Sequence, residues 1–343
     1  MPEKYCKLLI TDTTRNWNGS ACWFAVDRVT PLTDPTSADN VHMDAATFLA
    51  AGQSLVVNST ANCLNMDWTG ATNSPRLGGA SILYIYGDLT LISAMTVTNN
   101  SALIAIGSVQ RTWTTNNLDL SSTNVYMYDG GLNLIGSLLP KSLVLSSGTF
   151  TSNNNTITTA GKVQIDTASA KTVTLGSSII NCGLWSYLGS NLTLTANTAT
   201  INCSASFSGG GITTYNIVNI TVATSTISGN NTFAQLNGTP AITQTLTFTD
   251  GSTQTVTTSS NLSGTAGHIH TLTGTSTGGW MITKSGGGTI LASYVTIKYS
   301  QASPVSTFYA RPPSTNGGGN TGWIFPSSQG NNVLEQALMA GLI

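Results

Sequence analysis

The chain has 343 residues, of which 40% are hydrophobic and only 7% are charged, and its net charge is −1. Disordered chains combine low hydrophobicity with high charge, so this composition excludes disorder, and the twelve basic residues are too scattered to neutralise a nucleic acid. The apolar runs have the length of strands and fall far short of the roughly 18 residues that cross a membrane. We therefore expect neither a nucleic-acid partner nor membrane insertion.

Residues 1–78 are expected to form a small N-terminal β domain or cap. Pro31, Pro35 and Pro75 interrupt this segment, and proline is confined to strand edges, bulges and turns. The Thr, Ser, Asn and Gly residues that dominate the chain suit short strands separated by tight turns. Short strands and loops are therefore expected here, with room for one helical turn in the run TFLAAGQSLVV.

Residues 79–308 have a different sequence pattern. Short strands in which apolar and polar residues alternate recur there without helices between them. Runs such as SILYIYG, NVYMY, SLVLS and TVTLG alternate apolar and polar residues. The later apolar centres recur at uneven intervals, at Ile227, Leu246, Leu262, Ile282 and Ile297. Such a short, drifting repeat excludes alternating βαβ units and predicts an all-β, right-handed parallel β-helix, a solenoid of stacked coils. An antiparallel β-sandwich is the competing fold, although its Asn-Gly and Asp-Gly hairpin turns are few.

Residues 309–343 are expected to close the solenoid, because the open end of a stack of strands is an aggregation template. Trp323, Ile324 and Phe325, in the segment TGWIF, are expected to cover the last coil. The final segment predicts a short amphipathic helix used in assembly, since its apolar residues recur every four positions. That helix would carry Leu334, Leu338 and Leu342 on one face.

Five cysteines form no CxxC pair, and their number is odd. We expect them to be mostly reduced and to serve as small buried hydrophobes. One disulfide, between Cys182 and Cys203, is geometrically conceivable because the two residues lie about one repeat apart in the sequence.

Several segments, in order along the chain, resemble a family of β-helical proteins common in tailed-phage genomes and related bacterial sequences. The N-terminal part of the resemblance is carried by RNW, ACWF, SADNVHMDAATF and ANCLNMDWTGATNSPRL. Its downstream part is carried by KTVTLGSSIINCGLW, FSGGGITTYNIVNIT, STISGNNTFAQL, LTFTDGSTQTV and NTGWIF. The resemblance covers about residues 15–325, so the final helix lies outside it. It implies a parallel β-helix with a virion or surface role, and it brings no catalytic motif.

Three pairs of aromatic residues are candidates for binding glycans. The two members of each pair are two residues apart and therefore share one face of a strand. If they face outward, their amphipathic rings offer platforms for sugar rings; core filling or a subunit interface is the alternative. The pairs are Tyr84 and Tyr86, Tyr126 and Tyr128, and Trp185 and Tyr187.

Two strand carboxylates, Asp119 and Asp166, are the only candidates for glycan cleavage, which needs two carboxyl groups about 5–10 Å apart. They lie two to three coils apart, which places them about 10–14 Å from each other at the usual spacing of strands. That separation is marginal, so no catalytic residues and no cofactor are expected.

Two groups of residues are candidates for binding a metal ion. His268 and His270, in the segment GHIHT, would share one side of a strand, and a trimer would bring three such pairs together around its axis. In the N-terminal segment SADNVHMDA, a second cation site could draw on Asp39, His42 and Asp44, although capping and turn hydrogen bonds are the competing role.

These patterns predict a structural protein of a phage particle: a fibre, appendage or decoration protein, with host-surface polysaccharide as its candidate ligand. Other virion proteins and two sister chains of a homotrimer are the expected partners. No secretory signal is visible in the first residues, which favours a virion protein that is assembled in the host cytoplasm and released by lysis. A glycan-degrading tailspike and a bacterial cell-surface adhesin are the two alternatives.

Overall fold

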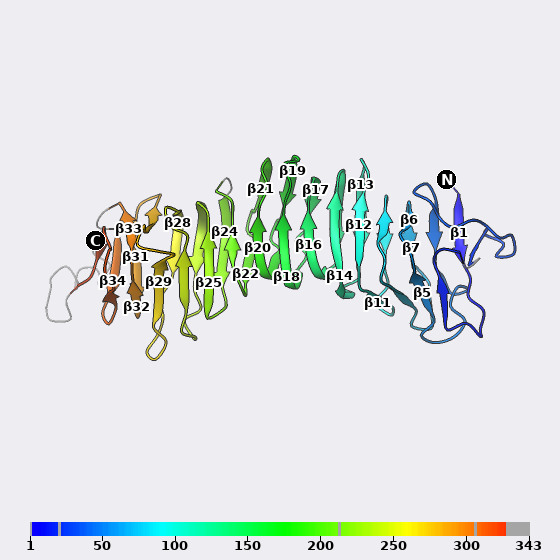
Figure 1. Ribbon diagram of the computed structural model, residues 1–343, viewed down its shortest axis with the longest axis horizontal. Helices are drawn as coiled ribbons and strands as arrows, with labels where there is room; N and C mark the ends of the chain where they lie inside the picture. The colour runs from blue at the N-terminus through cyan, green and yellow to red at the C-terminus, as the bar shows by residue number, and fades with distance from the viewer. Residues whose placement is uncertain (1, 20–21, 212–213, 305–306, 327–343) are drawn as a thin grey trace. The chain divides into compact units, whose positions relative to one another are not determined.

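The computed structural model describes residues 2–19, 22–211, 214–304 and 307–326, and all of its regular elements are strands (Figure 1). The strands wind into a parallel β-solenoid of about 13 turns. The predicted parallel β-helix is confirmed, and the antiparallel sandwich is excluded because successive coils pair their strands in parallel. Within the described residues there is no helix that is both long and apolar enough to cross a membrane.

The chain divides into two compact units, Met1–Asn219 and Ile220–Ile343. In the first unit, successive coils stack into three sheets. The first sheet contains β1 (Glu3–Cys6), β4 (Asn40–His42), β7 (Met66–Asp67), β10 (Leu89–Thr90), β13 (Gln110–Thr114), β15 (Gly131–Ile135), β17 (Gly148–Thr151), β19 (Lys171–Thr174) and β21 (Leu192–Thr195), with β3 (Trp23–Phe24) antiparallel at its edge. The second sheet contains β2 (Thr14–Asn16), β5 (Ser54–Val57), β8 (Arg76–Gly79) and β11 (Thr96–Asn99).

The third sheet of the first unit carries the candidate site. It contains β6 (Ala61–Cys63), β9 (Leu83–Ile85), β12 (Ala102–Ile106), β14 (Asp119–Tyr128), β16 (Leu139–Leu145), β18 (Ile157–Ile165), β20 (Ile179–Tyr187), β22 (Thr200–Cys203), β23 (Phe207–Ser208) and β24 (Thr214–Ile220), whose last residue begins the second unit.

The second unit repeats the same architecture with its own three rows of strands. One row contains β25 (Thr224–Ser228), β27 (Thr245–Phe248), β29 (His270–Gly274), β32 (Val295–Ile297) and β35 (Thr315–Asn316). A second row contains β26 (Asn231–Asn237), β28 (Thr253–Asn261), β30 (Trp280–Lys284) and β33 (Ser300–Ser303). The third row contains β31 (Ile290–Ser293), β34 (Phe308–Arg311) and β36 (Trp323–Ile324).

The alternating sequence of the strands explains the solenoid core. Within the third sheet, residues in register form an inward row that is apolar in every coil, and each of its members is almost completely buried. Burying one such side chain contributes about 1.5–3 kcal/mol to the free energy of unfolding. Each coil is therefore stabilised by the apolar side chains of the coils above and below it. The row contains Leu83, Leu103, Val125, Leu143, Val163, Trp185 and Phe207.

Each coil is longer than the spacing of the apolar centres in the sequence suggested. Thr224 pairs with Thr245, and Thr245 pairs in turn with Thr271, so one full turn of the chain separates these threonines. The expected repeat was too short because it treated apolar centres on different faces as equivalent: Leu246 belongs to β27, whereas Ile282 belongs to β30 in another row.

The described parts of the two terminal segments, residues 1–78 and 309–343, contribute strands to the same kind of ladder as the middle of the chain. In the N-terminal segment, β4 already pairs with β7, and β5 pairs with β8, in parallel and in register. In the C-terminal segment, β34 pairs with β31, and β36 pairs with β34. Both segments are therefore part of the ladders, and the chain divides between residues 219 and 220.

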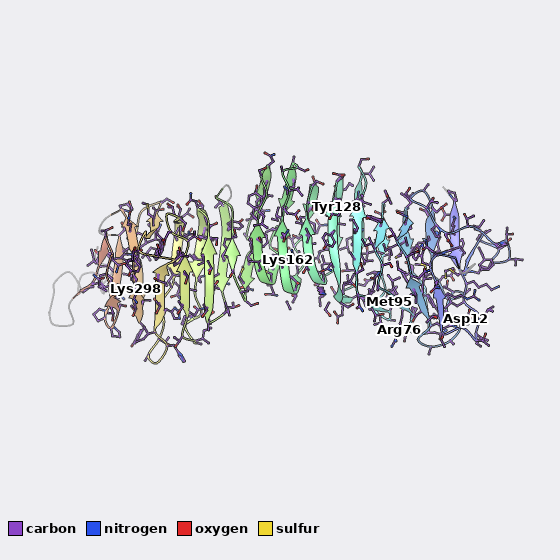
Figure 2. All side chains as sticks on the ribbon, viewed as in Figure 1. Asp12, Arg76, Met95, Tyr128, Lys162 and Lys298 are labelled. Carbon is purple, nitrogen blue, oxygen red and sulfur yellow. The ribbon has the colours of Figure 1, made fainter. Side chains whose placement is uncertain are left out.

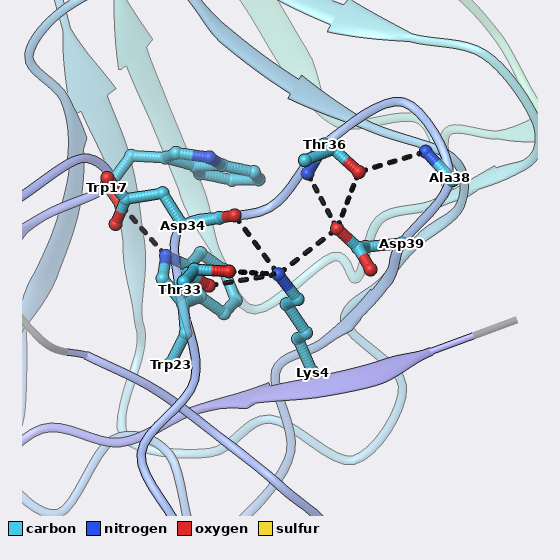
Figure 3. Close-up of polar contacts among 8 residues, drawn as sticks. All are labelled: Lys4, Trp17, Trp23, Thr33, Asp34, Thr36, Ala38 and Asp39. Atoms are coloured by element: carbon cyan, nitrogen blue, oxygen red, sulfur yellow. Dashed lines mark hydrogen bonds and ion pairs between the residues drawn. The ribbon is translucent and has the colours of Figure 1, made fainter.

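The N-terminal end of the first unit is covered by a segment that contains Trp17, Trp23, Thr33 and Asp34 and lies within the expected β domain or cap of residues 1–78. Trp17 and Trp23 are completely buried and pack edge to face, with their ring centroids 4.9 Å apart. Beside them, the Lys4 ammonium donates to the carbonyl oxygens of Thr33 and Asp34 and lies 3.1 Å from a carboxylate oxygen of Asp39 (Figure 3). A buried cation needs such complete pairing, so Lys4 fixes the covering segment to β1.

At the other end, Trp323 is buried and its ring centroid lies 5.1 Å from that of Phe308. Its indole N–H donates to Ser300. Ile324 and Phe325 are half-buried. The structure thus places Trp323 in the last described coil, while the predicted assembly helix with Leu334, Leu338 and Leu342 lies outside the described residues.

All five cysteines are buried and none forms a disulfide, as the composition indicated. Cys182 and Cys203 are in-register partners on neighbouring coils, with their sulfur atoms 3.8 Å apart. The conceivable disulfide between them is therefore not formed.

Candidate glycan-binding groove

Two of the three aromatic pairs face outward from the third sheet of the first unit. Tyr126 and Tyr128 are half-buried, while Val125 and Met127, which alternate with them in β14, are fully buried. The same alternation turns Tyr84 and Tyr86 outward beside β9. Along each strand the purely apolar side chains fill the core, and the tyrosines, which carry a hydroxyl group, lie at the surface.

Three of these tyrosines, Tyr84, Tyr126 and Tyr128, line a groove with a volume of about 670 Å³, which we call the tyrosine groove; Tyr86 lies outside its lining. Tyr84, Ile104 and Tyr126 are in-register partners on three successive coils, so their side chains stand in one row. The rings of Tyr126 and Tyr128 stack almost in parallel, with centroids 6.0 Å apart. Ten residues line the groove: Ile82, Tyr84, Asn100, Ser101, Ala102, Ile104, Ile106, Asn124, Tyr126 and Tyr128.

A polar chain continues from the tyrosine groove across the next two coils. Ser146 stands beside Tyr128 on the next coil, because Met127 and Leu145 just before them are in-register partners, and the Ser146 hydroxyl donates to Asp166 at 2.8 Å. The Gln164 amide donates to the other carboxylate oxygen of Asp166 at 2.9 Å, and the Lys162 ammonium donates to the Gln164 carbonyl oxygen. Figure 2 labels Tyr128 and Lys162, the two ends of this chain.

The pKa of Tyr128 is raised above its ordinary value. Partial burial is the main cause, and the neighbouring tyrosines and the charge of Asp166 add to it. Both effects disfavour the phenolate. Tyr128 therefore keeps its hydroxyl proton throughout the neutral range.

The third aromatic pair takes the alternative role, core filling, and is not an outward platform. Trp185 and Tyr187 are 1% and 4% exposed and point into the solenoid. The Trp185 indole N–H donates to the Tyr215 hydroxyl at 3.3 Å, and the two rings pack edge to face. These residues fill the core, because their in-register partners on the neighbouring coil, Val163 and Ile165, belong to the same buried inward rows.

The predicted metal pair, His268 and His270, does not form. His268 is exposed in a turn, whereas His270 is completely buried at the start of β29. The two ring nitrogens of His270 lie 3.0 and 3.1 Å from the carbonyl oxygens of Leu262 and Ile242. The two histidines share no face, because the antiparallel bridge of Thr265 with His268 keeps His268 outside the strand.

The residues of the second predicted cation site also do not come together, because each of them has a different partner. Asp39 pairs with Lys4, and Asp44 lies 2.6 Å from Arg28. His42 contacts Glu3 and stacks on Tyr5. Among the described residues, no group of three or more His, Cys, Asp or Glu side chains is arranged to hold a metal ion.

The two strand carboxylates that were candidates for glycan cleavage lie at different places in the fold. Asp119 begins β14 and accepts a hydrogen bond from the Ser121 amide, an arrangement typical of a turn. Asp166 follows the end of β18 and belongs to the polar chain. The structure therefore does not bring the two carboxylates together across a groove.

Sequence reasoning identified the tyrosines but missed the polar chain. Its members come from three successive coils, and the true coil length is needed to see that Ser146 and Asp166 follow Tyr128 in the same outward row. The i, i+2 spacing of Lys162, Gln164 and Asp166 was a usable signal, since these residues must share one face of a strand.

No protein-family model matches the chain, and neither the curated proteins nor the solved structures contain a significant match to it.

Proposed function

We propose that the chain is a structural protein of a phage particle, a fibre, appendage or decoration protein, whose tyrosine groove binds a host-surface glycan. The observation that carries the glycan-binding part is the stacked pair Tyr126 and Tyr128, held outward on the ladder of the third sheet. The virion part is supported by the resemblance of the ordered segments to phage β-helical proteins.

The physical reason for assigning a glycan lies in the surface of a sugar ring. One face of a pyranose presents C–H groups, while its edge presents hydroxyl groups. Tyrosine rings offer large contact area at little entropic cost, and their hydroxyls supply hydrogen bonds. Asn100 and Asn124 add amide groups at the rim of the groove, so the tyrosine groove supplies both kinds of contact.

The binding surface is also preorganised. Tyr126 sits on a strand that pairs in register with β12 on one side and β16 on the other. A side chain held in this way loses little freedom on binding, and preorganisation raises affinity by reducing that cost.

Other virion proteins and two sister chains of a homotrimer are the proposed partners, and the particle is the proposed location. Imaging of an intact particle with a labelled chain tests this part of the proposal. Absence of the chain from purified particles would reject it and would favour a bacterial cell-surface adhesin.

The glycan-binding part is tested by replacing Tyr126→Ala and Tyr128→Ala and measuring retention on a glycan array. Loss of binding in both variants supports the proposal. Thr247→Ala, on the outward side of β27, is the matched control and should bind as the unaltered chain does. Release of reducing sugar from a bound polysaccharide would instead indicate a glycan-degrading tailspike.

A further inference from the structure

One face of the second unit, formed by the row of strands that begins with β25, is covered by threonines. Thr224 and Thr226 are two residues apart on β25, so both point to the same side of the strand. The same spacing recurs at Thr245 and Thr247 on β27, where Leu246 between them is completely buried. Each of these coils therefore carries two threonines side by side on its outer surface.

The pairing of the strands arranges these threonines in two columns, which together we call the threonine array. The register continues without a shift from β25 through β27, β29 and β32 to β35 in this part of the described chain. The shorter column ends at Lys298, which follows Ile297 and is labelled in Figure 2. The longer column contains Thr224, Thr245, Thr271, Thr296 and Thr315, and the shorter one contains Thr226, Thr247 and Thr273.

We infer that the threonine array is an ice-binding surface, whose ligand is the ordered water of an ice crystal face. This inference goes beyond the proposed function and does not depend on the tyrosine groove. It commits to one occupant, an uncharged lattice that repeats in two directions. The competing explanation is that threonine stands at these positions only because it is a good outward residue for a strand.

The two spacings of the threonine array are the main argument for ice. Strands in a sheet lie about 4.8 Å apart, which sets the distance between threonines on successive coils, and residues two apart on one strand are separated by about 6.6 Å. Water molecules on the prism faces of hexagonal ice repeat along two perpendicular directions by distances close to these. Both threonines of a coil can therefore meet equivalent positions of the ice lattice, coil after coil.

The chemistry of the threonine side chain also suits an ice surface. Its methyl group restricts the orientation of water in the first hydration shell, and its hydroxyl both donates and accepts hydrogen bonds. Of the hydroxyls in the threonine array, all on described residues, only that of Thr273 donates to the protein, to the carbonyl oxygen of Gly274 at 3.2 Å. The other hydroxyls are available to water.

The threonine array is held rigidly before it meets any ligand. Threonine is branched at Cβ, which restricts its χ1 angle, and β27 pairs in register with a strand on each side. Beneath the array, Leu246, Leu272 and Ile297 are completely buried, so the array rests on a filled interior. Side chains fixed in this way lose little freedom on binding, which reduces the entropic cost of contact with a solid.

The first unit carries a shorter version of the same pattern on β17, β19 and β21, where paired threonines are again in register. On β15 their places are taken by Gly131 and Asn133, and β21 is the last strand of its sheet. The threonine array of the second unit is therefore the longer of the two, and the experiment is directed at it.

Uptake of the full chain into a growing ice surface tests the inference, because ice excludes proteins that do not bind to it. We expect the unaltered chain to be enriched in the ice and to slow the growth of single ice crystals just below their melting point. Thr247→Lys should lose most of this uptake, because a long charged side chain holds the neighbouring threonines away from the lattice. Thr247→Val, which keeps the branched shape, should retain most of it.

Thr98→Lys is the matched control. Thr98 is an exposed, outward threonine of β11, and its in-register neighbour on β8 is Gly78, so it belongs to no column of threonines. This variant should be taken up as the unaltered chain is, and so should Tyr126→Ala. Circular dichroism at the temperature of the ice experiment checks that each variant is folded, and Thr271→Lys in the longer column provides a second disrupting variant.

The outcomes decide the inference separately from the proposed function. Exclusion of the unaltered chain from ice overturns it and leaves the threonines with a structural role only. Equal uptake of the unaltered chain and of folded Thr247→Lys and Thr271→Lys also overturns it, because another face would then bind the ice. Neither result affects glycan binding through the tyrosine groove, which is measured on the glycan array with Tyr126→Ala.

Discussion

The two units carry different residues on their outward faces, although apolar residues fill the interior of both. In the first unit, the row of Tyr84, Ile104 and Tyr126 builds a groove. In the second unit, the equivalent outward positions of β25, β27 and β29 are threonines in register, Thr226, Thr247 and Thr273. Both sets alternate with buried apolar residues. The inward positions are thus fixed by the need to fill the solenoid, whereas the outward positions are free to carry a function.

A second comparison lies within the first unit. Tyr126 and Tyr128 have the same i, i+2 spacing as Trp185 and Tyr187, but the first pair faces outward and the second inward. The spacing shows only that two rings share a face; which face they share depends on the residues between them. Substitutions in the two pairs should therefore affect different properties.

The largest effect is expected from Trp185→Ala. Removing a fully buried tryptophan should cost about 3–5 kcal/mol of unfolding free energy, whereas Tyr126→Ala on the outward face should cost about 1 kcal/mol or less. Chemical denaturation followed by circular dichroism measures both. Equal losses for the two variants would remove the distinction between inward and outward aromatic residues.

For glycan affinity, unlike stability, we expect a clear effect from a substitution on the outward face. Tyr126→Ala should lower affinity about tenfold, which corresponds to about 1.4 kcal/mol, because a stacking surface is lost. Titration calorimetry with an oligosaccharide selected on the array measures the change. Thr247→Ala should leave affinity unchanged. A loss of affinity in that variant would mean that the threonine ladder, the in-register row of Thr226, Thr247 and Thr273, also binds the glycan.

Alkaline pH should weaken the first unit partly through Tyr128. Its pKa is raised in the folded chain, so the folded state holds the proton more tightly than the unfolded state. That contribution to stability is fully present below the ordinary tyrosine pKa of about 10 and is lost as pH rises through the raised value. Tyr128→Phe should remove this part of the alkaline decline, which a series of thermal unfolding scans at rising pH measures; an unchanged decline would contradict this contribution of Tyr128.

The smallest change in unfolding free energy is expected from a substitution in the threonine ladder. Thr247 is half-buried on the outward side, and valine has the same branched shape. Thr247→Val should shift unfolding free energy by less than about 0.5 kcal/mol. A thermal unfolding scan checks this, and a large destabilisation would show that the hydroxyl ladder itself holds the coils together.

The architecture was predictable from the sequence because strict alternation constrains every coil. The length of a coil was not predictable, since Leu246 and Ile282 look equivalent until the rows of strands to which they belong are known. The direction of the aromatic pairs follows from the competition for the core: Val125 and Met127 outcompete tyrosine for the interior, whereas Trp185 and Tyr187 continue the buried inward rows of Val163 and Ile165. Ser146, the partner of Asp166 on the neighbouring coil, could not be found in the sequence, because the coil length that aligns the two residues is set by loop lengths. Gln164, its other partner, shares its side of the strand and could have been found.

Hydroxyl-radical footprinting read by mass spectrometry tests the central claim, that the tyrosine groove is an outward glycan site on a filled solenoid. Tyr126 and Tyr128 should be modified in the free chain and protected by an oligosaccharide selected on the glycan array, while Trp185 and Tyr187 stay unmodified in both states. Modification of all four residues alike, or no protection of Tyr126 and Tyr128 by a glycan that binds, would contradict it.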